Sequence, residues 1–493
     1  MAPPPRALLA SASELASQIR RGTTTSREVV AAHIEAIRRV NPSLNAMVRD
    51  RFDDAMKEAA AADARVSSEP TASLPPLIGV PCTIKECFAV RGMPQSAGLK
   101  ARRDVVASAD ATVVSRLQDA GAIVLGVSNT SELCMWMESD NRVYGRTNNP
   151  YDPSRSAGGS SGGEASLVGA GLSPFGLGSD VGGSIRIPAG FCGVFGHKPS
   201  GGLVPSTGQY PIAKGGAQTF LTTGPLTRRA EDLMPILRLL AGPDGSDLGC
   251  AALPLVDPSE HSLADHPVFI ARFPRRAKIS PTQLKATEDA AIALESTGAR
   301  CREIDMPAFA KTLAWWAAGL TSDGNAPYRK MLGLRGPWSL LRQFARLPLR
   351  RADHTLPSLV LASVDRRVLG AQTQRRLLDH AQRCSSLIQE KLGTGIMIAP
   401  SYPRVAPRHG HAMMRPFAAY ATLVFNVLEL PVTQVPMGLD KDGVPTGVQI
   451  VASHGHDHRT ICAAQHLERR FGGWTPPSRL WSNDVAASPA ASL

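Results

Sequence analysis

The sequence predicts an α/β fold, because segments with helical periodicity alternate with short apolar segments that are typical of strands. A helical pattern over residues 111–120 is followed directly by an apolar strand pattern over 122–127. An alanine-rich helical pattern over 52–66 likewise precedes a strand pattern over 78–84. The chain has 493 residues, of which 43% are hydrophobic and 19% are charged. A chain of this length and composition can bury a large core within a single domain.

The other elements are expected in the following order. Apolar residues recur at helical spacing over 11–40, with Ser11 and Ser13 as candidate N-caps. The Asn-Pro-Ser sequence at 41–43 is expected to end this helical segment. Farther along we expect a largely helical segment, two strands and a final helix, over residues 280–390, 430–436, 447–452 and 459–471.

The composition argues against several classes of protein. The eight cysteines form no C-x-x-C pair and are widely spread, so we expect reduced thiols rather than disulfides or a zinc site. No apolar run approaches the ~18 residues of a membrane span, and no secretory signal is recognisable, so a cytoplasmic protein is expected. The formal net charge of +12 is not accompanied by a nucleic-acid-binding motif, and no nucleic-acid partner is expected.

Two clusters of glycine and serine, at residues 158–163 and 178–184, are the strongest chemical signal in the sequence. Glycines around hydroxyl groups let several backbone N–H groups converge on one point, which creates a site for an anion. An enzyme that transfers acyl groups needs such a site for the developing oxyanion, together with a nucleophile. A serine in either cluster is therefore a candidate nucleophile.

A nucleophilic serine also needs a base, and the sequence offers two kinds of candidate. The histidines in 454–458 alternate with other residues after a predicted strand, where they fit a polar turn better than a metal site. Lys85 ends the apolar strand pattern, and a lysine that enters the interior is depressed in pKa. The alternative for Lys85 is a strand-end side chain that extends to solvent.

The first cluster also satisfies the G-x-S-x-G pattern of the nucleophile elbow in α/β-hydrolases, which would make Ser160 the nucleophile. That interpretation requires a strand, turn and helix around Ser160 and an Asp and His downstream. Glycines on both sides of the serines and the presence of the second cluster argue against it.

The motifs resemble those of the amidase-signature family, closest to its fatty-acid amide hydrolase branch. Ser160 lies 75 residues after Lys85, and Ser184 lies 24 residues after Ser160, which are spacings similar to those of the family. The resemblance covers about residues 10–475, although 250–395 carries little of it. The strings that carry it are 79–86, 132–136, 144–150, 158–163, 178–188, 195–199, 425–426, 430–433 and 447–451.

The resemblance implies a Ser-Ser-Lys triad. Ser184 would attack the carbonyl, Ser160, on an expected cis peptide, would relay the proton, and Lys85 would act as the neutral base. Asp180 and Ser161 would support these residues. The oxyanion hole would consist of the backbone N–H groups of Val181, Gly182, Gly183 and Ser184. No cofactor or metal is implied.

The resemblance also implies one large mixed, twisted β-sheet covered by helices, which would form a catalytic domain over 11–475. The poorly matched segment at about 305–390 would be a variable, helical, cap-like region. Residues 1–10 are expected to be a flexible N-terminus and 482–493 a disordered tail. The resemblance is compatible with a homodimer.

The expected activity is hydrolysis of carboxamides that carry an apolar acyl or aryl part, with esters and carbamates as related substrates. Cys134, Met135 and Trp136 are expected to line the substrate cleft or lie beside it. The alternative function is that of the glutaminase-like subunit of a tRNA-dependent amidotransferase. A binding protein without activity is disfavoured because all three triad positions are present.

Basic and apolar residues alternate over 329–351. On a helix from 338 to 347, apolar residues at 340, 341, 344 and 347 would share one face, and arginines at 342 and 346 another. Such a helix can cap a cleft, contact an anionic membrane peripherally, or pack on the core as an ordinary surface helix.

Overall fold

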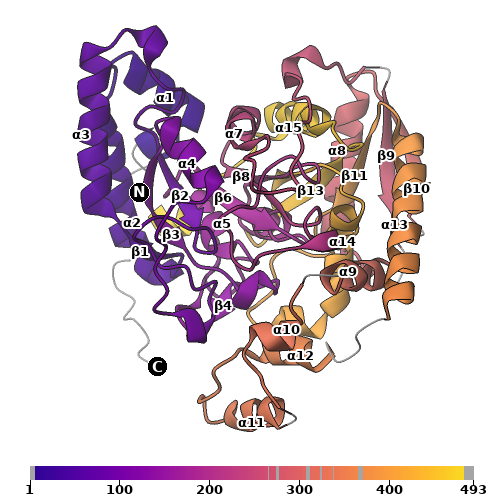
Figure 1. Ribbon diagram of the computed structural model, residues 1–493. Helices are drawn as coiled ribbons and strands as arrows, with labels where there is room; N and C mark the ends of the chain where they lie inside the picture. Colours follow the sequence, from indigo (N-terminus) through magenta and orange to yellow (C-terminus); the bar gives the residue numbers. More distant parts are fainter. Residues whose placement is uncertain are drawn as a thin grey trace.

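An eleven-stranded β-sheet forms the centre of the computed structural model (Figure 1). The structure describes residues 6–481 except 265, 274–276, 307–310, 323–324, 337 and 365–369. The expected mixed sheet covered by helices is confirmed. In spatial order the strands are β1 (Met47–Asp50), β3 (Ile123–Ser128), β2 (Pro81–Lys85), β6 (Phe175–Asp180), β8 (Thr222–Thr227), β7 (Phe195–Lys198), β12 (Val432–Leu439), β13 (Pro445–Val451), β11 (Ile396–Pro400), β9 (Pro267–Arg272) and β10 (Arg300–Asp305).

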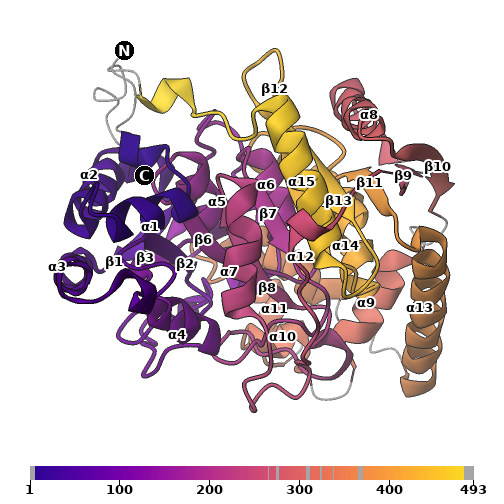
Figure 2. The same cartoon turned by 90° about the horizontal axis from the view of Figure 1, so that it is seen from above.

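Helices cover both faces of this sheet (Figure 2). Helices α1 to α3 lie at one end of the molecule and α13 at the other, whereas α10 to α12 form a separate group at the bottom of Figure 1. The helices are α1 (Ala12–Arg20), α2 (Ser26–Leu44), α3 (Phe52–Ser68), α4 (Thr112–Asp119), α5 (Gly162–Gly169), α6 (Arg186–Phe191), α7 (Leu233–Leu240), α8 (Pro281–Glu295), α9 (Thr312–Leu320), α10 (Tyr328–Met331), α11 (Ser339–Arg346), α12 (Leu356–Val364), α13 (Ala371–Leu392), α14 (Tyr420–Val427) and α15 (Asp457–Phe471). None of these described helices has the length and apolar character that crossing a membrane requires.

The pairing of β2 and β6 determines the position of Lys85 relative to the second glycine and serine cluster. The two strands run parallel, with Thr83 opposite Gly176 and Ile84 opposite Leu177. This register brings Lys85, the last residue of β2, level with the Gly178-Ser179 step of β6. All residues of both strands are buried, so polar side chains at this edge are shielded from water.

Three expectations about the N-terminal half are wrong. Helix α2 continues through Pro42 to Leu44, because burial of Leu44 and the closure by Asn45 in the left-handed conformation outweigh the hydrogen bond that Pro42 cannot donate. Strand β2 begins at Pro81 rather than at residue 78, because the backbone N–H of Ile78 and of Val80 close turns before it.

The third correction concerns residues 6–10, which were expected to be flexible. Arg6–Leu8 form a short 3-10 helix, and Leu8 is buried against the residues of α2. The backbone oxygen of Ala10 accepts a hydrogen bond from the buried Arg228. Residues 1–5 and the predicted tail at 482–493 lie outside the described residues.

Candidate active site

Lys85 and Ser160 meet at the edge of the sheet formed by the ends of β2 and β6. The Nζ atom of Lys85 donates to Oγ of Ser160 at 2.7 Å and to Oγ of Ser179 at 3.0 Å. All three side chains are buried. The Gly159–Ser160 peptide bond is cis, as expected. Sequence reasoning missed Ser179, although its place beside Lys85 follows from parallel pairing of the two strands.

Ser184 lies on the turn that connects β6 to α6. The backbone oxygen of Ser184 accepts a hydrogen bond from the N–H of Ser161 at 3.1 Å, so the two glycine and serine clusters are joined directly. The hydroxyl of Ser161 in turn donates to the backbone oxygen of Ser179 at 3.2 Å. Ser184 is 8% exposed, whereas Lys85 and Ser160 are fully buried. Of the three predicted catalytic residues, Ser184 is therefore the one that solvent reaches.

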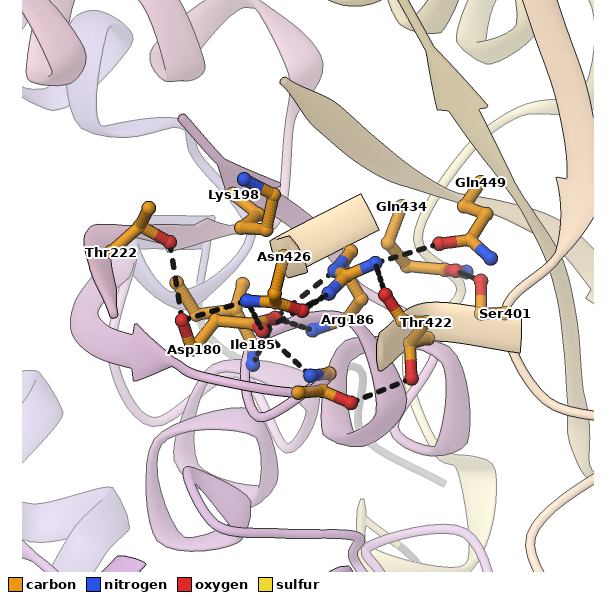
Figure 3. A network of polar contacts seen from close by, with 12 residues as sticks. Asp180, Ile185, Arg186, Lys198, Thr222, Ser401, Thr422, Asn426, Gln434 and Gln449 are labelled. Atoms are coloured by element: carbon orange, nitrogen blue, oxygen red, sulfur yellow. Dashed lines mark hydrogen bonds and ion pairs between the residues drawn. The ribbon is translucent and has the colours of Figure 1, made fainter. Parts of the chain in front are cut away.

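The turn around Ser184 is held by the carboxylate of Asp180 (Figure 3). Asp180 accepts hydrogen bonds from the backbone N–H groups of Gly183 at 2.6 Å and Ile185 at 3.0 Å. It also forms a fully buried ion pair with Arg186, whose Nε lies 3.0 Å from Oδ2. Burial alone would raise the pKa of Asp180, but Arg186 and the hydrogen-bond donors hold it well below its ordinary value.

The hydrogen bond from the Gly183 N–H to Asp180 changes the expected set of N–H groups in the oxyanion hole. Because this N–H already donates to Asp180, it is not free to bind an oxyanion. The N–H groups of Val181, Gly182 and Ser184 have no acceptor among the residues that the structure describes. Gly183 is required for a different reason: its φ is +124°, and a Cβ there would lie 2.3 Å from Oγ1 of Thr422.

Arg186 connects this turn to the C-terminal part of the chain. Its NH1 donates to the backbone oxygen of Thr422 at 2.9 Å and to Oε1 of Gln449 at 3.1 Å. Its NH2 donates to Oδ1 of Asn426 at 2.6 Å. The sequence motif includes Arg186, but only the folded chain identifies these partners.

The segment 134–136 lies beside the predicted triad. Cys134 is buried, and a hydrogen bond from Cys87 lowers the pKa of its thiol against the effect of burial. The backbone oxygen of Trp136 would lie 2.6 Å from a Cβ at Gly159, so this segment packs tightly against the residue before Ser160. Met135 packs against a leucine cluster that includes residues of α11 and α12.

A second contact joins this segment to the cap-like region. The buried carboxylate of Glu132 accepts hydrogen bonds from Nδ1 of His354 at 2.6 Å and from the backbone N–H of Thr355 at 2.9 Å. These two residues directly precede α12. The cap-like region is thus attached to the site through both apolar and polar contacts.

The orientation of α11 differs from the expected one. Leu340 is buried and Phe344 is partly buried in the Met135 cluster, but Leu341 is 59% exposed. Hydrogen bonds from Gln343 and Arg346 to Asp353 fix the rotation of this short helix and turn Leu341 outward. Leu341 therefore does not share the buried face with Leu340.

The histidines at 454–458 do not assemble a metal site. His454 and His456 lie in a turn, where ring nitrogens of both contact backbone oxygens, and His458 lies in the first turn of α15. Nowhere in the described ranges do three His, Cys, Asp or Glu side chains form a group that could hold a metal ion. All eight cysteines are free thiols.

Comparison with known proteins identifies the family. A family model described as Amidase matches residues 28–461. Fatty-acid amide hydrolase 2-A of Danio rerio is 42% identical over 96% of this chain and 90% of its own length. The chain belongs to the amidase family. It is an amide-hydrolysing enzyme, and the expected similarity to the fatty-acid amide hydrolase branch is confirmed.

Two further relatives place the amidase among its neighbours. The structure of a bacterial aryl acylamidase of the amidase signature family superposes with a TM-score of 0.79 at 25% identity, over 97% of this chain and 99% of the other. One subunit of the glutamyl-tRNA(Gln) amidotransferase of Prochlorococcus marinus (strain MIT 9303) is 31% identical over 93% of this chain and 96% of its own length. The lower identity gives the amidotransferase alternative less support.

A buried carboxyl group beneath the site gives the amidase a pH-dependent stability. Glu164, in the first turn of α5, is fully buried, and its Oε2 accepts a hydrogen bond from Oγ1 of Thr83 at 2.6 Å. Burial raises the pKa of Glu164 to about 7. Because an unfolded chain releases this proton near 4.5, the folded state binds more protons between these values. The contribution of Glu164 to the free energy of unfolding is therefore lost as pH rises toward 7.

We predict that Glu164→Gln flattens this pH dependence, because the amide does not titrate. Urea unfolding at about pH 5 and about pH 7 should show a smaller loss of stability in the variant than in the native enzyme. Glu288→Gln, at an exposed position of α8, is the control and should keep the native slope. Equal slopes in Glu164→Gln and the native enzyme would contradict a protonated Glu164.

Proposed function

We propose that this amidase hydrolyses carboxamides with an apolar acyl or aryl part through Ser184, Ser160 and Lys85. The observation that carries the proposal is the 2.7 Å contact between Nζ of Lys85 and Oγ of Ser160, in a buried site next to the turn that holds Ser184. Ser160 thus contacts an amine that solvent does not reach, and the next residue, Ser161, is hydrogen bonded to the backbone oxygen of Ser184.

In the proposed reaction, Ser160 passes the proton of the Ser184 hydroxyl to the unprotonated amine of Lys85. Oγ of Ser184 attacks the substrate carbonyl, and the N–H groups of Val181, Gly182 and Ser184 stabilise the oxyanion. The proton returns through Ser160 to the leaving nitrogen, since an amine leaves poorly unless it is protonated. Water then attacks the acyl-enzyme by the same route.

The proposed preference for apolar substrates rests on the residues around the site. Met135 packs with leucines of the cap-like region, and Cys134 and Trp136 lie on the same segment. Relatives named fatty-acid amide hydrolase and aryl acylamidase support amides of this kind. The same acyl transfer extends the proposal to esters and carbamates, because their carbonyl carbons accept the same attack. A cytoplasmic location and a homodimer stay predictions.

Ser184→Ala should abolish nearly all turnover of a p-nitroanilide while the melting temperature stays close to that of the native enzyme. The hydroxyl that forms the covalent bond has no substitute, and losses at such residues are steep. A fluorophosphonate probe followed by peptide mass spectrometry should label Ser184. Labelling of Ser160 instead would support the nucleophile-elbow interpretation. Turnover that requires glutamine and tRNA would favour the amidotransferase function.

Lys85→Arg should lower kcat by about 10²- to 10⁴-fold, the usual range for loss of a general base. Arginine keeps the hydrogen-bond donors of the lysine but is protonated near neutral pH, so it cannot accept the proton. The rate should be measured from pH 6 to pH 10, with circular dichroism as the control for folding. Native-like activity of the folded variant would contradict the role of Lys85 as base.

We also propose that α11 contacts anionic membranes peripherally. Trp338, just before α11, is 69% exposed, and Leu341 of α11 is 59% exposed. Arg342 lies on the same short helix, whereas Arg346 is already paired with Asp353. Apolar side chains that insert at the headgroup level and arginines that meet anionic lipid are the usual components of such a contact.

The double variant Trp338→Ser with Leu341→Ser should reduce co-sedimentation with phosphatidylserine vesicles and leave the melting temperature unchanged, because both side chains are exposed. High salt should release the native enzyme from the vesicles. Leu248→Ser removes an almost fully exposed leucine in another part of the chain and should bind like the native enzyme. If the native enzyme itself does not sediment with vesicles, α11 is only a cap or surface helix.

A further inference from the structure

We propose that Trp316 of α9 is a positioning residue for the oxyanion hole. This inference rests on the proposed function, because it concerns the turn that would receive the substrate oxygen. The indole Nε1–H of Trp316 donates to the backbone oxygen of Val181 at 2.8 Å. The contact joins the first residue of the oxyanion turn to a helix 135 residues later in the chain.

The direction of this hydrogen bond determines the direction of a neighbouring N–H group. In a trans peptide the C=O and the following N–H point in opposite directions. Because Trp316 holds the oxygen of Val181, the N–H of Gly182 in the same peptide is turned away from the indole. That N–H has no acceptor among the described residues, so it is available to an oxyanion.

The next peptide of the turn is held by different groups. Oγ1 of Thr422 donates to the backbone oxygen of Gly182 at 2.8 Å, and the N–H of Gly183 donates to Asp180. Each of the two peptides therefore depends on its own partners. In the peptide that presents the Gly182 N–H, the oxygen is held by Trp316.

The packing around Gly182 supports this assignment. A Cβ at Gly182 would lie 3.7 Å from Nε1 of Trp316 and 3.4 Å from Cδ1 of Leu423, in ordinary van der Waals contact with both. The indole and Leu423 thus both pack close to Gly182. Trp316 is partly buried and packs against the apolar cluster that includes Trp315 and Val424.

The hydrogen bond of Trp316 would act on the rate of the chemical step. Donors in an oxyanion hole are effective because they are already oriented before charge develops. Removal of one such donor costs about 10²- to 10³-fold in kcat, and looser positioning costs a part of that. Loss of the Trp316 hydrogen bond should therefore lower kcat by about 10- to 100-fold and change KM little.

The adjacent Trp315 provides a matched control. It lies on the same helix and is fully buried, but its Nε1 has no partner among the described residues. Trp315→Phe removes an indole N–H that makes no hydrogen bond, whereas Trp316→Phe removes one that holds Val181. Both changes replace an indole by a smaller ring in the same cluster.

The experiment compares Trp316→Phe, Trp316→His and Trp315→Phe in the full-length enzyme with an apolar p-nitroanilide. Trp316→Phe should lower kcat and weaken binding of a trifluoromethyl ketone, whose hemiketal oxygen occupies the oxyanion hole, by a similar factor. Trp316→His retains a ring N–H and should recover part of both losses. Trp315→Phe should keep native kcat, whatever its effect on the melting temperature.

Two results would overturn the proposal. Equal kcat values in Trp316→Phe and Trp315→Phe would show that the hydrogen bond does not matter for the reaction. A rise in KM with unchanged kcat and unchanged ketone binding would place Trp316 in substrate binding instead. Failure of the proposed function is recognised separately, because turnover would then survive in the Ser184→Ala variant.

Discussion

The buried ion pair between Asp180 and Arg186 is the interaction on which the rest of the site depends. Neither side chain is exposed, and removing two charges from water is expensive unless further hydrogen bonds satisfy them. Here the satisfying groups are the backbone of the Ser184 turn on one side and residues of α14 and β13 on the other. These hydrogen bonds tie the turn of Ser184 to β6, α14 and β13.

The surroundings of Lys85 differ in kind from those of Arg186. Its Nζ donates to two hydroxyl groups, which can both donate and accept. A carboxylate in the same place could only accept and would favour a permanently protonated lysine. The proposed role of Lys85 as a base therefore rests on hydroxyl partners and not on a carboxylate.

The segment with the fewest family motifs nevertheless contacts the site at several points. Leucines of the cap-like region pack on Met135, and residues just before α12 bind Glu132. Helix α9 supplies Trp316, which donates to the backbone oxygen of Val181 in the turn before Ser184. Variation in this region can therefore alter both the surroundings of a substrate and the arrangement of the turn, while the strands that carry Lys85 and Asp180 remain unchanged.

The sequence by itself determined the features that depend on residues close together along the chain. Periodicity located most helices and several strands. The glycine and serine clusters pointed to Ser160 and Ser184, and the end of an apolar strand pattern together with the family resemblance pointed to Lys85. Glycine spacing is informative because it reflects the local backbone conformation. The end of α2 was misjudged because burial of Leu44 outweighed the effect of Pro42.

Only the tertiary structure decided which polar groups have hydrogen-bond partners and which partners they have. The Gly183 N–H is used by Asp180, Ser179 is paired with Lys85, and the oxygen of Val181 is held by Trp316. The partners of Arg186 lie as far as 263 residues away along the chain. Hydrogen bonds of this kind form between segments that packing brings together, so no local pattern of residues can specify them. The outward rotation of Leu341 has the same origin, because a contact with Asp353 outside the helix fixes which face of α11 is buried.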